Sequence, residues 1–254
     1  MAVGLAEELL RRVQGNRERP NEWFFAASIL SSAFNATGKY AEAEAVCREA
    51  MTSVERMGIS AATPSMTQLG EHLGNELSNQ GKVAKAQPIF ERCLAELKQR
   101  LGPHHEKTLD TAISLGGNLA CQGKHAEAVV VLKDTLDRAK RAHGPEHVTA
   151  LRCGEKLANE LNSLCKYDEA RAMYYELLPV MKRVLGPDHT FVLTASSNYA
   201  TALVNCGGFV EAEAMLEENV AAQMRVFGPH HPGTVHAARG LAVLRQLNGR
   251  QVNG

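Results

Sequence analysis

Histidine, which often serves as a general base or a metal ligand, recurs beside proline at regular places in this sequence. The tetrapeptides GPHH, GPEH, GPDH and GPHH begin 42 residues apart, at Gly102, Gly144, Gly186 and Gly228. A fixed interval of this length is typical of a repeat protein, in which each tetrapeptide occupies an equivalent connection. We therefore expect these histidines to cap helices or pack in the connections, and to form neither a metal site nor a catalytic centre. They are His104, His105, His147, His189, His230 and His231.

Cysteine is the second residue type here that could carry chemistry, as a disulfide partner, a zinc ligand or a nucleophile. The six cysteines form no CxxC pair and are spread along the chain, unlike a disulfide framework or a zinc site. The repeat places no histidine beside a cysteine, and the sequence contains no phosphate-binding GxxxxGK[ST] loop. We therefore expect free thiols, no cofactor, no metal and no enzymatic activity.

Charge and hydropathy argue against two further classes. Among 254 residues, 28 lysines and arginines balance 28 aspartates and glutamates, so the basic excess of a nucleic-acid-binding protein is missing. No apolar run is long enough to span a membrane, and the opening MAVGLAEELLRRVQ is interrupted by charges where a signal peptide needs an apolar core. We expect a cytoplasmic protein that binds neither nucleic acid nor membrane.

The elements that must position these residues are helices joined by a recurring tight turn. The segments GKYAEA, GKVAKA, GKHAEA, CKYDEA and GGFVEA start at residues 38, 81, 123, 165 and 207, at intervals of 43, 42, 42 and 42. Apolar residues four and eight positions before each start, and an alanine five positions after it, follow the helical period. Each repeat is therefore predicted to be a first helix, a turn with glycine or Cys165 as the stop, and a second helix ending at Gly-Pro.

This pattern predicts one all-α repeat domain over residues 1–254, a right-handed α-solenoid of antiparallel helix pairs. Neither helix of a pair can bury its apolar side alone, so neighbouring repeats must stack. Within the second helices, Pro88 lies near a first turn and is tolerated, whereas Pro179 is expected to bend or shorten its helix. The expected ranges are a half-repeat helix at 1–15, five pairs at 21–57, 64–101, 105–143, 147–185 and 189–227, and a capping helix at 235–249.

The chain resembles tetratricopeptide repeats, specifically the 42-residue variety of kinesin light chains. The resemblance is carried by LGPDH and NYATALVNCGGFVEAEAMLEENV at 185–220, and by LGPHHEKTL and LGGNLACQGKHAEAVVVL from Leu101. It implies a tetratricopeptide-repeat superhelix in which the first helices line a concave groove that holds extended peptides. Asn198, in SNYA, matches an asparagine of that groove.

Positions thirteen, nine, six and two residues before each turn share one side of the first helix, roughly opposite the packing positions. Asparagine amides there can donate to and accept from a peptide backbone. Arg152 and Lys156, one helical turn apart, are placed to bind an acidic group. The alternative is that these polar residues form an ordinary solvent-exposed face and bind no peptide. The candidate groove residues are His72, Asn75, Asn79, Ser114, Arg152, Lys156, Asn159, Asn198 and Asn205.

The leading hypothesis is a non-catalytic interaction scaffold that binds a peptide or protein partner, with acidic residues in that partner as one option. Because a pure peptide receptor needs no second copy, we expect a monomer. One alternative is a self-associating structural module. Another is a regulatory fragment of a larger multidomain protein.

Overall fold

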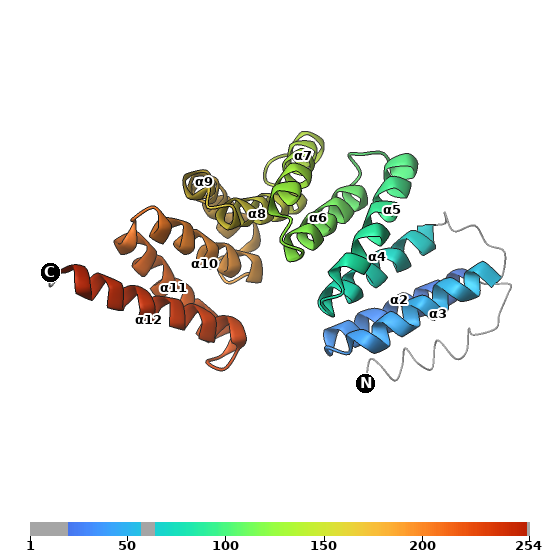
Figure 1. The fold of residues 1–254 in the computed structure, drawn as a ribbon, viewed down its shortest axis with the longest axis horizontal. Helices are drawn as coiled ribbons and strands as arrows, with labels where there is room; N and C mark the ends of the chain where they lie inside the picture. Colours follow the sequence, from blue (N-terminus) through green and yellow to red (C-terminus); the bar gives the residue numbers. More distant parts are fainter. Residues whose placement is uncertain (1–19, 57–63, 253–254) are drawn as a thin grey trace. The chain divides into compact units, whose positions relative to one another are not determined.

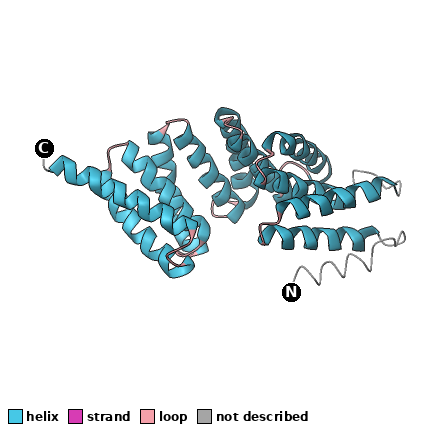
Figure 2. Cartoon of the chain, turned by 60° about the horizontal axis from the view of Figure 1, so that its bottom comes forward, coloured by secondary structure: helices cyan, strands magenta, loops and turns pink. Residues whose placement is uncertain are grey.

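The computed structural model describes residues 20–56 and 64–252, so the half-repeat helix predicted at 1–15 lies outside the described residues. Within those ranges the secondary structure is helical, without a strand (Figures 1 and 2). The helices are α2 (Pro20–Ala36), α3 (Tyr40–Arg56), α4 (Pro64–Asn79), α5 (Val83–Leu101), α6 (Glu106–Cys121), α7 (His125–His143), α8 (Val148–Ser163), α9 (Tyr167–Leu185), α10 (Thr190–Asn205), α11 (Phe209–Phe227) and α12 (Pro232–Val252).

The turn inside each repeat has the same backbone geometry five times. Its stop residue has a left-handed conformation, with φ of 73° at both Gly38 and Gly81, and of 58° at Cys165. In each turn the next amide reaches back five residues, as from Lys166 to the Leu161 carbonyl at 2.9 Å. This is the Schellman closure of a helix, for which glycine is the preferred stop residue. Cys165 adopts a conformation that costs a residue with a Cβ roughly 1–2 kcal/mol.

The connection between repeats uses the histidines as predicted, as helix caps. At His105, His147 and His189 the backbone is extended, and the ring Nδ1 accepts a hydrogen bond from the amide two residues later, at 3.2, 3.3 and 3.2 Å. His231 accepts from Gly233 in the same way at 3.2 Å. Because the cap lies outside the helix it begins, each of the three first helices starts one residue after its histidine.

Pro179 does not shorten its helix. The helix that contains it, α9, has 19 residues, as do α7 and α11. The carbonyl that loses its amide partner belongs to Tyr175, four residues earlier, and Tyr175 is exposed, so water can solvate that carbonyl. Pro88 is likewise contained in the uninterrupted α5, near its start.

The described residues fall into two compact units, one up to residue 131 and the other from residue 132 onward, called unit 1 and unit 2 below. In unit 1, α2 packs on α3, α4 on α5, and the first helices α2, α4 and α6 contact one another in order. A Cβ at Gly74 would lie 2.8 Å from the Phe90 ring, so glycine lets α5 approach α4 closely. In unit 2, α8 packs on α9, α10 on α11, α11 on α12, and α8 contacts α10.

Stacked helix pairs of this kind confirm the predicted fold class, an all-α solenoid type built from antiparallel helix pairs. The core residues of unit 2 include Leu151, Tyr174, Met181 and Leu203, all at most 1% exposed. Over the part of the chain that the structure describes, no helix is both long enough and apolar enough to cross a membrane.

Candidate partner-binding face

The nine candidate residues lie on first helices and none is buried in a core. The term inner face is used here for the side of the first helices that carries them. Unit 1 contributes His72, Asn75 and Asn79 from α4 and Ser114 from α6. Unit 2 contributes Arg152, Lys156 and Asn159 from α8, and Asn198 and Asn205 from α10. Asn75, Asn79 and Asn205 are exposed, and the other six are half-buried.

The first helices of unit 2 expose basic but no acidic side chains. Their only two carboxylates, Glu155 and Glu160 of α8, are 9% and 5% exposed, and α10 contains no charged residue. Arg152 and Lys156 are half-buried and Arg239 is exposed, whereas the exposed Arg245 is ion-paired with Glu213 and Glu217 of α11. The basic groups at inner-face positions of unit 2 are therefore Arg152 and Lys156 of α8.

Arg152 is held by an aromatic side chain of the next first helix. Its guanidinium lies 5.8 Å from the centroid of the Phe191 ring, within the range of a cation–π contact. Such stacking contacts the flat side of the guanidinium. Lys156, one turn further along α8, is half-buried on the same side.

Asn198 is engaged within the fold rather than pointing freely to solvent. Its side-chain nitrogen donates to Glu155 Oε1 at 3.1 Å, and its backbone oxygen accepts from Asn162 Nδ2 at 3.0 Å. Burial raises the pKa of Glu155, while the charge of Lys156 and the Asn198 amide oppose that rise. The groove role predicted for Asn198 stays a prediction, and one of its two N–H groups already bonds inside unit 2.

Asn159 and Asn205 also have local partners. Asn159 Nδ2 lies 3.4 Å from Glu160 Oε1, a long contact, and Asn205 Nδ2 donates to the Thr201 carbonyl of its own helix at 2.9 Å. An amide keeps an acceptor oxygen and a second N–H after one such bond. Both residues therefore retain hydrogen-bonding capacity at the surface.

Buried carboxylates between neighbouring first helices are the feature that the sequence reasoning missed. In unit 1, Glu76 is fully buried and accepts from Asn35 Nδ2 at 2.6 Å, and Glu71 accepts from the Thr111 hydroxyl. Burial raises the pKa of both carboxyls, and it lowers the pKa of His72. The available signal was the recurrence of glutamate ten positions before the turn, at Glu71 and Glu155, and five positions before it, at Glu76 and Glu160.

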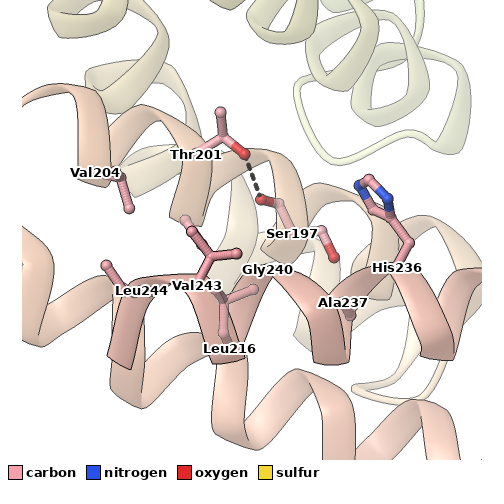
Figure 3. Close-up of a pocket in the computed structure, with 10 residues that line it drawn as sticks. Ser197, Thr201, Val204, Leu216, His236, Ala237, Gly240, Val243 and Leu244 are labelled. Atoms are coloured by element: carbon pink, nitrogen blue, oxygen red, sulfur yellow. Dashed lines mark hydrogen bonds between the residues drawn. The ribbon is translucent and has the colours of Figure 1, made fainter. Parts of the chain in front are cut away.

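A cavity of about 170 Å³ opens between α10 and α12 in unit 2 (Figure 3). Figure 3 shows Thr201 and Ser197 of α10 along one side, Gly240 and Val243 of α12 along the other, and Leu216 of α11 below them. Thr201, His236, Gly240 and Val243 stand at inner-face positions of the repeat. This cavity, called the α10–α12 pocket below, was not predicted, because the candidate positions were not extended into the last helix.

Two larger cavities in unit 2 lie at equivalent positions of successive repeats, so they are a general feature of the repeat. One, of about 300 Å³, is lined by residues of α8 and α9 that include Gly154 and Met173. The other, of about 310 Å³, is lined by Ser196 and Met215, which stand 42 residues further along. The α10–α12 pocket has no such counterpart among these cavities, which makes it the more specific feature.

The comparisons with known proteins agree with this architecture. Two sequence profiles of the tetratricopeptide repeat family match the chain, one over residues 65–141 and the other over residues 151–190 and 192–233. No curated protein sequence matches it.

Three solved structures illustrate the likeness in fold. A Podosopora anserina protein described as a kinesin light chain with nearly identical TPR-like repeats has a TM-score of 0.69 and 20% identity over 82% of this chain and 97% of that one. BtubC (BKLC) from P. vanneervenii has a TM-score of 0.73 and 17% identity over 91% and 92%. YrrB, a TPR protein with an unusual peptide-binding site, has a TM-score of 0.52 and 15% identity over 92% and 99%.

The matched segments cover more than half of the sequence, and the 42-residue helix pairs, their turns and their stacking are those of kinesin-light-chain-like repeat structures. The chain therefore belongs to the tetratricopeptide repeat family.

Proposed function

We propose that this protein is a non-catalytic interaction module whose unit 2 binds an acidic peptide segment of a partner protein along its inner face. The observation that carries the proposal is the charge of α8 and α10: Arg152 and Lys156 lie half-buried at inner-face positions, both carboxylates of α8 are buried, and α10 contains no charged residue. An acidic segment gains attraction there without meeting an exposed like charge. The tetratricopeptide fold and the peptide-binding site of a fold relative support this class of function.

Arg152 and Lys156 are the residues we assign to the acidic group. Phe191 holds the Arg152 guanidinium from one side, which reduces the ordering that a ligand must impose. A guanidinium and an ammonium one turn apart can bind a carboxylate together. The polar side chains of Asn159 and Asn205 then contact the backbone of the segment without reading its side chains.

The test is a selection from a displayed library of random peptides, with the full-length chain as bait. We expect enrichment of peptides rich in aspartate and glutamate, and loss of binding by about tenfold or more when Arg152→Glu and Lys156→Glu are combined. The matched control is Lys133→Glu with Arg141→Glu, the same charge change on exposed residues of α7, a second helix. Equal losses in both double variants, or no acidic enrichment, would contradict the proposal.

Cytoplasmic location and a monomeric state remain predictions. Light scattering over a concentration series checks the monomer. A mass that grows with concentration would favour the self-associating alternative.

A further inference from the structure

The carboxyl group of Glu76 in α4 lies in the core of unit 1 with few partners. This residue is 0% exposed, the smallest exposed fraction of any lysine, arginine, aspartate or glutamate that the structure describes. Its Oε1 accepts a hydrogen bond from Asn35 Nδ2 of α2 at 2.6 Å, whereas its Oε2 is buried and has no hydrogen-bond partner among the described residues. An ionised carboxylate with one donor and no cation is strongly unfavourable in such a place.

The polar groups near Glu76 on α2 and α3 supply no positive charge to it. Asn35 is uncharged, and the thiol of Cys47 in α3 donates to the Ser31 hydroxyl of α2 at 3.3 Å. Burial raises the pKa of Cys47 to about 11, and the negative charges of Glu76 and Glu44 contribute to that rise. The cations near α3 are bound by Glu44 instead, which accepts hydrogen bonds from Arg48, Gln80 and Lys82.

The charged groups of α4 and α6 also leave Glu76 without a cation. His72, one turn earlier on α4, is half-buried, and burial lowers its pKa, so it is uncharged at neutral pH. The charges of Lys107 and Asp110 on α6 act on Glu71 of α4. No ion pair of Glu76 therefore exists among the described residues of these two helices.

The remaining neighbours are α5 and the start of α2. On α5, Glu96 accepts a hydrogen bond from the Thr67 hydroxyl. The one charged residue of α2, Glu22, lies in its first turn, more than three helical turns before Asn35. The other charged side chains of α5 are exposed, and they are Lys85, Glu91, Arg92, Lys98 and Arg100.

The next repeat makes the equivalent link between first helices with uncharged groups. Asn118 of α6 stands 42 residues after Glu76, and Ser78 of α4 stands at the position of Asn35 before the turn. The Asn118 amide is 2% exposed and donates to the Ser78 hydroxyl at 2.9 Å and to the Val83 carbonyl at 3.1 Å. A neutral side chain is thus compatible with this position, and a protonated Glu76 is neutral in the same way.

We propose that Glu76 keeps a proton in the folded chain, so that α2 and α3 pack on α4 most firmly in acidic solution and separate from it more readily as the pH rises. The helices α2 and α3 both contact α4, so their separation admits water to the carboxyl. This property concerns the stability of unit 1 and is independent of the ligand proposed for unit 2.

The direction of the pH effect follows from the pKa of Glu76 in the packed and separated states. Burial raises this pKa in the packed state, and the Asn35 amide opposes the rise. A carboxyl whose pKa is raised by packing contributes stability that is complete below the pKa of the solvated group. That contribution is lost as the pH rises through the pKa of the packed group. Between these two values the equilibrium constant for separation rises up to tenfold per pH unit.

Glu76→Gln provides the decisive variant because it keeps an acceptor oxygen for Asn35 and cannot ionise. Glu76→Asn repeats the test with the residue type that the next repeat carries at this position. The matched control is Glu42→Gln, the same chemical change at an exposed carboxylate of α3. Other titrating groups of unit 1, including Glu71 and His72, are common to all these proteins, so their effects cancel in the ratio of wild type to variant.

The experiment is hydrogen exchange of the full-length chain from about pH 5 to about pH 8, read by mass spectrometry in peptides of α2 and α3 and corrected for intrinsic exchange. We expect the ratio of the wild-type opening constant to that of Glu76→Gln to rise with pH, by up to tenfold per pH unit, and to exceed one at the upper end. The ratio for Glu76→Asn should rise with the same slope. The ratio for Glu42→Gln should stay constant.

A second measurement observes the proton directly. In protein labelled with ¹³C at glutamate Cδ, the carboxyl signal that is absent from Glu76→Gln should titrate at a higher pH than that of Glu42. Titration of the Glu76 signal at or below the pH of the Glu42 signal would overturn the proposal. A ratio for Glu76→Gln that does not change with pH, or that changes no more than the ratio for Glu42→Gln, would overturn it as well.

Discussion

The pair Asn198 and Glu155 shows that a side chain at an inner-face position can also form a hydrogen bond that holds neighbouring helices together. Asn198 is half-buried and donates to a carboxylate that is 9% exposed. A buried carboxylate is costly when charged, and the Asn198 amide and the nearby Lys156 charge offset only part of that cost. Replacing Asn198 by alanine would leave Glu155 with fewer partners as well as remove a candidate groove side chain, so such a variant cannot test binding alone.

Glu155→Gln should stabilise the protein at neutral pH. Glutamine keeps an acceptor oxygen for Asn198 and removes the buried charge, whose close neighbours are Lys156 and Glu160. Because burial raises the pKa of Glu155 in the folded state, wild-type folding gains stability as the pH falls through that pKa and the carboxyl takes up its proton. The advantage of Glu155→Gln in urea unfolding should therefore be largest at neutral pH and should shrink toward pH 4. An advantage that grows on acidification would refute this account.

Each first helix from α6 onward begins one residue after a capping histidine, and this fixes where the inner-face residues stand. The ring of the capping histidine accepts a hydrogen bond from a backbone amide of the first turn, and this amide has no carbonyl partner within the helix. In α12, proline follows the cap at the first helical position, where its missing N–H costs nothing. The cap thus sets the start of the helix that forms one wall of the α10–α12 pocket.

His231→Ala should lower the free energy of unfolding by about 1 kcal/mol, since it removes the cap of α12 and the ring stacked on Phe227. The adjacent His230→Ala is the control, because the capping bond to Gly233 comes from His231 and not from its neighbour. Thermal unfolding followed by circular dichroism compares the two variants. Equal destabilisation by both substitutions would show that capping is not what His231 contributes.

At the scale of the whole chain, a net charge of zero conceals two different sets of first helices. Those of unit 2 carry Arg152 and Lys156 half-buried and bury their glutamates. In α4 and α6 of unit 1, Glu76 is buried, Glu71 and Asp110 are half-buried, Glu106 is exposed, and Lys107 is the one lysine or arginine. Under the proposed function, an acidic ligand is therefore attracted more to the inner face of unit 2 than to that of unit 1.

Titration of an isotopically labelled protein with a selected acidic peptide should perturb amide resonances of α8, α10 and α12 more than those of α4 and α6. The affinity should fall as salt rises from about 0.05 to about 0.5 M, because screening shortens the range of charge attraction from roughly 14 Å to roughly 4 Å. Perturbations concentrated on α4, or an affinity indifferent to salt, would contradict the assignment to unit 2.

The sequence alone determined the helix pairs, their turns and the capping histidines, because these depend on local backbone geometry and on a period that a single chain displays. It also placed the nine candidate residues on first helices, since the 3.6-residue period assigns each position to a side. Only the tertiary structure decided which polar side chains hydrogen-bond to a neighbour, as Asn198 does to Glu155. It also decided where a cavity remains between helices, as beside Gly240. Both depend on how side chains from adjacent repeats fill a shared volume, and that volume is set by packing in three dimensions.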